Sequence, residues 1–239
     1  MSSIINAYRN IISDNSWFLK TVIMSIPIFM VLNFVMEKTN GIDEKTFALF
    51  VAILVLYLGT GTHIMNRNIN NNAPILPNIL ELPELLFHSF FSIIVALPGG
   101  ALCLVAIKLI NTYFSFDFKT MCCLYAITII LFCPFIFIPL CLYSMNRKIA
   151  EAFNLKPLID GGGNFIVSIF SFIVQYIFTF AIVWALLYIV FSQMMSDNII
   201  VNIIHSFFIV LTFLTLFSYI SDQFGDSIPD PRTSKELYF

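Results

Sequence analysis

Six stretches of this 239-residue chain contain no Asp, Glu, Lys or Arg, and their lengths constrain its fold more than any other feature. A helix needs about 20 apolar residues to cross the hydrocarbon core of a bilayer, and an ionised side chain is costly at the bilayer centre. The uncharged runs are residues 21–36, 46–66, 85–107, 120–146, 161–196 and 198–221. This pattern predicts an all-α integral membrane protein with about six transmembrane helices.

The composition also favours a lipid bilayer as the environment of the chain. Hydrophobic residues make up 59% of the chain and charged residues 11%, whereas about a quarter of a soluble protein is charged. The net charge is -2 and no basic cluster is present, which excludes nucleic-acid binding. The five cysteines all lie inside predicted spans and lack the spacing of metal ligands, so we expect neither a metal site nor a cofactor.

The runs define the expected domain organisation. We expect one polytopic membrane domain over residues 1–221 and a flexible cytoplasmic tail over residues 222–239. The expected spans are residues 17–36, 46–66, 85–110, 120–145, 164–192 and 198–220. The fifth run counts as one span because residues 165–190 contain no Pro or Gly to form a turn. Gly161, Gly162 and Gly163 are assigned to the loop before that span.

The distribution of Lys and Arg predicts the orientation, because both residues are enriched on the cytoplasmic side of membrane proteins. With the N-terminus inside, eight of the twelve basic residues are cytoplasmic and four are not. The inner eight are Arg9, Lys20, Arg67, Arg147, Lys148, Lys156, Arg232 and Lys235, and the outer four are Lys38, Lys45, Lys108 and Lys119. We therefore expect a multi-pass protein of the cell membrane with both termini in the cytoplasm.

Short amphipathic segments precede the first, third and fifth spans. Their apolar residues are Ile4, Ile5, Tyr8, Ile11 and Ile12, then Ile79, Leu82 and Leu86, then Ile149, Ala152 and Phe153. Apolar residues at this spacing predict helices that lie on the cytoplasmic surface of the membrane.

The recurrence of these segments suggests an internal repeat. Ala7, Tyr8, Asp14, Trp17 and Phe18 follow one another much as Ala152, Phe153, Asp160, Asn164 and Phe165 do. One interpretation is three copies of a unit made of a surface helix and two spans. The other is that any transition from loop to span tends to be amphipathic.

Three stretches carry a family resemblance. They are Ala7 to Arg9 followed by Ser16 to Lys20 with Ile26 and Pro27; Leu58 and Gly59 leading through His63 to Arg67 and then Leu76 and Pro77; and Ala152 and Phe153 ahead of the Gly and Asn loop. Together they resemble the bacterial and archaeal membrane proteins grouped as domain of unknown function 4013, over most of the chain to about Ile220. Thr60 stands where the family has Tyr. The resemblance implies several spans with polar loops between helical hairpins, and it implies no activity.

The centre of the third run holds the first candidate site. Pro98 removes a backbone donor, and Gly99 and Gly100 loosen the helix beside it. One interpretation is a discontinuous helix whose freed backbone groups line a transport pathway. The other is a packed kink without a ligand.

Ionisable groups near membrane depth are the remaining candidates. His205, with Asn202 and Ser206, lies in the sixth span, where an imidazole needs a hydrogen-bond partner. At the start of the third span, the helical spacing of Glu81, Glu84 and His88 places them on one face that could hold a proton or cation, or form the wet side of a surface helix.

No catalytic motif is present, so we do not expect an enzyme. Two classes remain. We expect a membrane-embedded structural or assembly subunit that binds a protein partner or another copy of itself within the lipid bilayer. The alternative is a transporter or channel component that uses a discontinuous third helix at Pro98 to Gly100.

Overall fold

The computed structural model describes residues 4–37, 44–70, 74–114, 118–178, 185–186, 189 and 198–227. The regular elements in these ranges are helices, and no strand occurs among them. In chain order they are α1 (Ile4–Ile12), α2 (Trp17–Glu37), α3 (Glu44–Ile69), the 3-10 helix η1 (Ile79–Glu81), α4 (Leu82–Tyr113), α5 (Phe118–Asn146), α6 (Ile149–Ala152), α7 (Leu155–Tyr176) and α9 (Asn198–Ser227). The predicted all-α class is confirmed.

Several of the helices are suited to a bilayer. Four are long and apolar enough to cross one, namely Leu82–Tyr113, Cys123–Asn146, Leu155–Tyr176 and Ile199–Phe224. A fifth is added if α1 and the first part of α2, which meet at 100°, count as one span. The described residues therefore give four or five spans by length and composition. In the second half of the predicted fifth span, residues 179–184, 187–188 and 190–192 lie outside the described residues.

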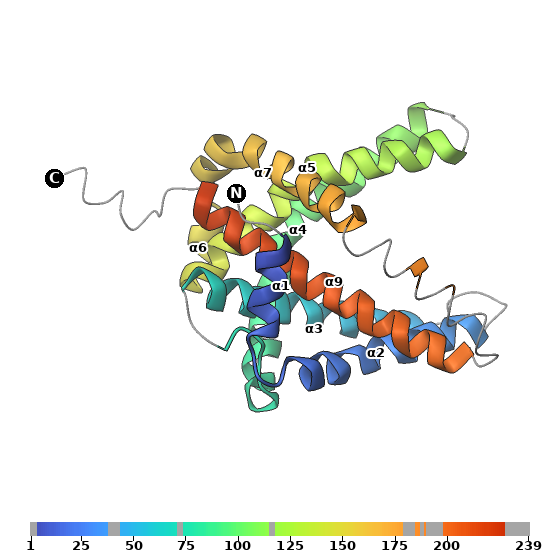
Figure 1. The fold of residues 1–239 in the computed structure, drawn as a ribbon. Helices are drawn as coiled ribbons and strands as arrows, with labels where there is room; N and C mark the ends of the chain where they lie inside the picture. The colour runs from blue at the N-terminus through green and yellow to red at the C-terminus, as the bar shows by residue number, and fades with distance from the viewer. Residues whose placement is uncertain are drawn as a thin grey trace.

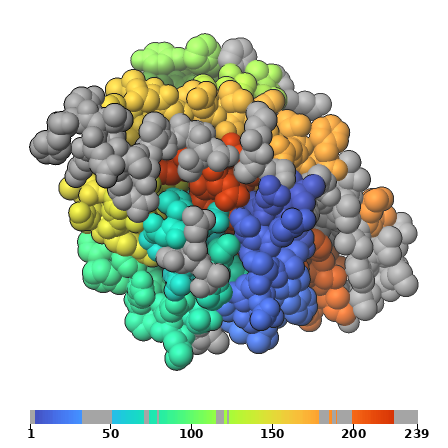
Figure 2. All heavy atoms as spheres, turned by 60° about the vertical axis from the view of Figure 1, so that its left-hand side comes forward, coloured from blue at the N-terminus to red at the C-terminus, as the bar shows by residue number. Residues whose placement is uncertain are grey.

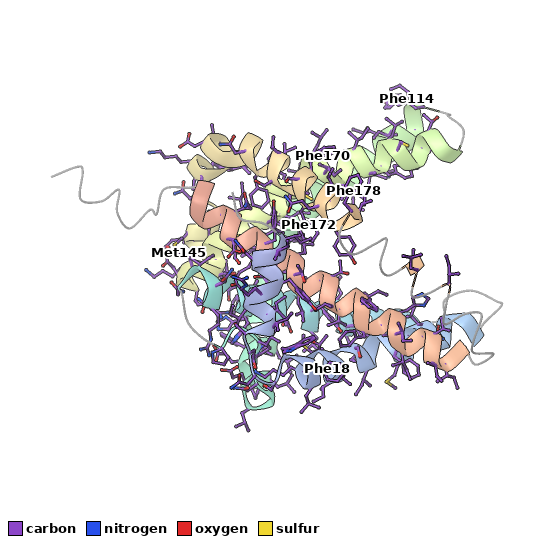
Figure 3. The ribbon with its side chains drawn as sticks, viewed as in Figure 1. Phe18, Phe114, Met145, Phe170, Phe172 and Phe178 are labelled. Atoms are coloured by element: carbon purple, nitrogen blue, oxygen red, sulfur yellow. The ribbon has the colours of Figure 1, made fainter. Side chains whose placement is uncertain are left out.

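The helices extend in two directions from a shared base. Helices α2, α3 and α9 pack on one another and extend one way, while the hairpin of α4 and α5 extends another way (Figure 1). Helix α7 packs on both α5 and α9. Figure 3 places Met145 at the base and Phe114 at the far end of the hairpin.

Helices α3, α4, α5 and α9 build the main core at the base. Its fully buried members include Ile64, Met65, Ile138, Leu140, Val210 and Leu214. Two glycines permit the close approach of helices there. A Cβ at Gly59 would lie 2.5 Å from the carbonyl oxygen of Leu85, and one at Gly61 would lie 2.2 Å from the Phe217 ring.

Helix α1 corrects one prediction. It is amphipathic as expected, but its apolar face packs on protein rather than on the membrane surface alone. Ile4, Ala7 and Ile11 are buried, and Ile4 and Ala7 belong to a cluster with Phe172 of α7 and Tyr219 of α9. Hydrophobic periodicity predicts that a face is covered and does not say by what, which is why the sequence missed this contact.

Helix α7 corrects a second prediction, which assigned three glycines to a loop. Gly161, Gly162 and Gly163 lie inside this helix and not in a loop before it. The helix begins earlier because the side chain of Asn154 caps it, accepting a hydrogen bond from the backbone N–H of Lys156 at 3.1 Å. Asp160 is thus in mid-helix, whereas Asp14 precedes the start of α2. The two segments compared as repeats therefore differ at this point, and the threefold repeat stays a prediction.

Helix α9 extends beyond the predicted last span. It continues to Ser227, so the first residues of the predicted tail are helical. The rest of the tail, residues 228–239, lies outside the described residues.

Candidate functional site

Ionisable residues from three helix ends meet at the base of the bundle. The polar cluster, as it is called below, consists of His63 and Arg67 at the end of α3, Glu81 and Glu84 at the start of α4, His88 one turn further along α4, and Tyr143 and Arg147 at the end of α5. The helices α3, α4 and α5 pack on one another here. Groups far apart in sequence are thereby brought within reach of one another.

Glu81 is the centre of one half of the cluster. Its carboxylate accepts a hydrogen bond from Arg67 Nη2 at 2.8 Å and another from the backbone N–H of Asn78 at 2.8 Å. His63 Nε2 lies 3.7 Å from the same carboxylate, which is beyond hydrogen-bond distance. The His63 side chain is buried, and its Nε2 has no hydrogen-bond partner among the described residues. Glu81 therefore joins α3 to the loop before α4.

His88 and Arg147 form the other half around Tyr143. His88 Nδ1 and the Tyr143 hydroxyl lie 2.7 Å apart, and the Arg147 guanidinium lies near Tyr143 with its buried Nη1 lacking a hydrogen-bond partner among the described residues. Burial lowers the pKa of Arg147, although Tyr143 and Glu84 oppose that shift. An arginine remains charged in proteins, so Glu84 and Arg147 attract each other. This half joins α4 to α5.

Arg147 also carries an unusual backbone conformation. Its φ is 56°, in the left-handed region where side chains other than Gly are uncommon. The conformation falls between the end of α5 and the start of α6. The backbone N–H of Arg147 still donates to the carbonyl of Tyr143 at 2.7 Å. The turn directs the chain into α6 while the Arg147 side chain stays beside Tyr143.

A second polar contact fixes the corner between α1 and α2. Asp14 is buried and accepts hydrogen bonds from Lys20 Nζ at 2.7 Å and from the backbone N–H of Ser16 at 2.9 Å. Burial by itself would raise the pKa of Asp14, but the Lys20 and Ser16 bonds hold this pKa below its ordinary value. Lys20 also donates to the carbonyl of Leu76 at 3.0 Å. The loop before α4 is thus tied to α2 as well.

Asn68 links the end of α3 to the end of α9. Its side-chain amide donates to the carbonyl of Ser218 at 3.1 Å and to the hydroxyl of Ser221 at 2.7 Å. It also contacts the carboxylate of Asp222. The ends of α3, α5 and α9 and the start of α4 therefore all take part in polar contacts at the base.

No relative supplies a role for this network. The chain matches no family model, no curated protein and no solved structure. The resemblance to domain of unknown function 4013 therefore stays a prediction.

The predicted site residues fall in three separate places. Glu84 and His88 lie in the polar cluster, with Glu84 Oε1 3.7 Å from His88 Nε2. Asn202 and His205 lie near the start of α9, at the opposite end of that helix from Tyr219 and the base. Asn202 is buried, and its carbonyl accepts a hydrogen bond from the Ser206 hydroxyl at 2.7 Å inside the helix.

At the third place, Pro98 to Gly100, the structure excludes one of the two interpretations of the sequence, the discontinuous helix. Helix α4 runs unbroken from Leu82 to Tyr113 with Pro98 inside it. A proline removes one backbone hydrogen bond, and the flanking turns can continue the helix. The site is also closed on one side, because a Cβ at Gly99 would lie 2.3 Å from the carbonyl oxygen of Phe135 in α5. Gly100 is open, because a Cβ there would meet nothing within 4 Å.

Sequence reasoning missed three members of the cluster. Arg67 and Arg147 were considered only as orientation markers, and Tyr143 was not considered. A signal was available, since Arg67 follows His63 by four residues and Arg147 follows Tyr143 by four, which puts each pair on one helix face. Among the described residues, no group of three His, Cys, Asp or Glu side chains could hold a metal ion. The ion pair of Glu81 with Arg67 and the contact of His88 with Tyr143 link the ends of α3, α4 and α5.

Proposed function

We propose that this protein is a membrane-embedded assembly subunit that binds another protein chain through the far half of the α4–α5 hairpin. This surface, the apolar arm, comprises residues 100–113 of α4 and 118–131 of α5. The observation that carries the proposal is the exposure of large apolar side chains on the arm. These are Leu102, Leu104, Val105, Leu109, Ile127, Ile129 and Leu131.

The distribution of the exposed residues matters as much as their number. In α4, Leu102, Leu104 and Val105 point in different directions around the helix, and each is about half exposed or more. A helix that packs only within its own chain buries one continuous stripe. The exposed sides of the arm must therefore be covered by lipid, by another protein chain or by both.

Gly100 gives the apolar arm a point at which a helix of a partner chain can pack closely. Membrane helices associate without a hydrophobic driving force between them, so small residues that allow close approach are enriched at their interfaces. Gly99 faces α5, whereas Gly100, on a different side of α4, faces open space. A partner helix could approach the backbone of α4 at Gly100 and pack against Leu104, one turn further on.

The polar groups of the chain support assembly over transport. At the base, Arg67 of α3 forms an ion pair with Glu81, and His88 of α4 lies beside Glu84 and Tyr143. The discontinuous helix on which the transport alternative depended is absent, because α4 is continuous. We propose no transport function for this reason.

We further propose six spans with the base on the cytoplasmic side. The described basic side chains Arg9, Lys20, Arg67, Arg147, Lys148 and Lys156 belong to segments at or near the base, whereas Lys108 lies towards the other end of α4. An excess of Lys and Arg on the cytoplasmic side supports this orientation.

Native mass spectrometry of the protein purified from its own membranes in mild detergent tests the assembly function. We expect a stoichiometric complex with a second protein or with another copy of this chain. Gly100→Leu adds bulk to the proposed interface, and we expect it to dissociate the complex. Val167→Leu, at an exposed position on α7, is the control and retains the complex. A protein that is monomeric in every preparation, or a complex that Gly100→Leu leaves intact, contradicts the proposal.

A further inference from the structure

Two cavities beside α2 meet at three shared residues. The first has a volume of about 590 Å³ and is bordered by α1, the end of α3 and the loop before α4. The second has a volume of about 440 Å³ and runs between α2, α3 and the start of α4. Ser16, Lys20 and Asn78 line both. Each volume is in the range of small-molecule sites, about 300–1,000 Å³.

The first cavity is lined mostly by polar residues, two of them cationic. Its charged lining residues are Asp14, Lys20 and Arg67. Lys20 pairs with Asp14, and Arg67 pairs with Glu81, which does not line the cavity. Arg67 has five N–H donors, and its hydrogen bond to Glu81 involves Nη2 alone. Its remaining donors suit a phosphate group, which guanidinium binds through several hydrogen bonds at once. This cavity favours an anionic group.

The second cavity is lined mainly by apolar side chains, and its hydroxyl groups are not available to a ligand. Its polar members are already engaged: the Tyr57 hydroxyl donates to the carbonyl of Met24, and the Thr60 hydroxyl donates to the carbonyl of Leu56 at 3.0 Å. The rest of its wall includes Leu19, Ile23, Met24, Pro27, Leu82 and Leu85. Such a cleft accepts hydrocarbon and gives no advantage to a polar ligand.

The apolar cleft is accessible from the side of the molecule. Leu19, Ile23 and Leu82 line it and are between 39% and 61% exposed, so its walls continue onto the outer surface of α2 and α4. Figure 2 shows this face, with the blue N-terminal helices beside the green start of α4. Hydrocarbon can therefore enter sideways from a bilayer, while the polar cavity lies near the ends of the helices.

From this pairing we propose that the two cavities form one binding site for a membrane phospholipid with an anionic headgroup. The phosphate lies in the polar cavity near Arg67 and Lys20, and one acyl chain lies in the cleft between α2 and α4. The shared residues Ser16, Lys20 and Asn78 mark the junction between headgroup and chain. Anionic lipids of the cytoplasmic leaflet attract basic residues at that level of the membrane. The site is separate from the apolar arm and does not depend on the assembly function.

Native mass spectrometry of the delipidated full-length protein, titrated with phosphatidylglycerol and with phosphatidylcholine of the same chain length, tests the proposal. We expect phosphatidylglycerol to bind about tenfold more tightly than phosphatidylcholine, because both lipids carry the phosphate but the trimethylammonium group of phosphatidylcholine is disfavoured beside Lys20 and Arg67. Leu82→Trp fills the cleft and should weaken that binding by about tenfold or more. Leu86→Trp is the matched control, since Leu86 is similarly exposed one turn along α4 but does not line the cleft, and it should bind normally.

The headgroup half has its own variant. Arg67→Gln combined with Glu81→Gln removes both members of an ion pair, so no uncompensated charge is left behind. We expect this double variant to bind both lipids equally, whereas Lys148→Gln, at an exposed site outside the cavities, retains the preference. If Leu82→Trp fails to fold, Ile23→Trp fills the same cleft from the opposite wall.

Two results would overturn the proposal. One is equal binding of the two lipids together with no effect of either cleft-filling variant, which would mean nonspecific adsorption. The other combines two observations. Excess inorganic phosphate fully displaces phosphatidylglycerol from the unchanged protein, and inorganic phosphate also binds the cleft-filling variants as tightly as it binds the unchanged protein. That result would mean a site for free phosphate in which the apolar cleft plays no part.

Discussion

The α4–α5 hairpin is held by its neighbours at one end and largely uncovered at the other. At the polar cluster, His88 and Tyr143 join the two helices while Glu81 and Arg67 attach them to α3. On the apolar arm, Leu104 is 68% exposed and Val105 is 56% exposed. Interactions that fix the fold are therefore concentrated at the base, and the arm is where a change can alter binding without unfolding the chain.

The largest difference is expected between two glycines. Gly59→Ala places a Cβ 1.9 Å from the Ser89 hydroxyl and 2.5 Å from the carbonyl of Leu85, so α3 and α4 must move apart. We expect a loss of about 3 kcal/mol, the upper range for overpacking. Gly100→Ala meets nothing within 4 Å and should be neutral or slightly stabilising, since Ala favours helix. Thermal unfolding in detergent measures both, and equal stability of the two variants would contradict the contrast.

Removal of Glu81 should have the next largest effect. Glu81→Ala leaves Arg67 and the backbone N–H of Asn78 without their acceptor, and we expect a loss of about 2 kcal/mol. The control is Lys148→Ala, because Lys148 pairs with Glu151 at 3.3 Å but is 69% exposed. Exposed pairs contribute about 0–1 kcal/mol. Denaturant titration of the purified variants measures both losses of stability. If Lys148→Ala lost as much stability as Glu81→Ala, the polar cluster would contribute no more than an exposed ion pair.

The Asp14 contact predicts a pH dependence. The pKa of Asp14 is lower in the folded protein than its ordinary value of 3.8, so its contribution is fully present at neutral pH. It is lost as the pH falls below the ordinary value and through the folded one, because protonation removes the charge that Lys20 pairs with. Melting temperatures between neutral pH and about pH 3 should fall less steeply for Asp14→Asn than for the unchanged protein. Parallel curves would exclude Asp14 as a contributor.

The smallest effect on stability is expected on the arm. Leu104→Ala removes an exposed side chain, and its stability should change by no more than about 0.5 kcal/mol. The same variant should release the partner, because it deletes a large apolar contact beside Gly100. Thermal unfolding and native mass spectrometry of one preparation give both values. A variant that unfolds readily would place Leu104 in the core of the fold and not on a binding surface.

The sequence could predict those features of the fold whose physical cause lies within a single segment of the chain. The uncharged runs predicted helices suited to a membrane, because each charged residue within a span is costly in lipid. The same-face spacing of Glu84 and His88 was also visible. Tyr143, which contacts His88, was not identified, because the contact between α4 and α5 depends on packing that no single segment encodes.

The errors have equally specific causes. Gly161 to Gly163 suggested a loop because Gly disfavours helix by about 1 kcal/mol each, yet the cap at Asn154 starts α7 before them. Pro98 and its glycines suggested a break, but the small size of Gly99 serves the close approach of α5. A glycine that permits packing and a glycine that loosens a helix are identical in sequence, and only the neighbouring helix distinguishes them.

Site-specific photocrosslinking in native membranes tests the central claim most directly. A photoreactive amino acid replaces Leu104 on the arm in one variant and Val167 on α7 in another, both exposed positions. The account predicts one discrete protein crosslink, to a partner or to a second copy of this chain, from position 104 and only lipid adducts from position 167. Lipid adducts alone from both positions would contradict the assignment of the arm as a protein-binding surface.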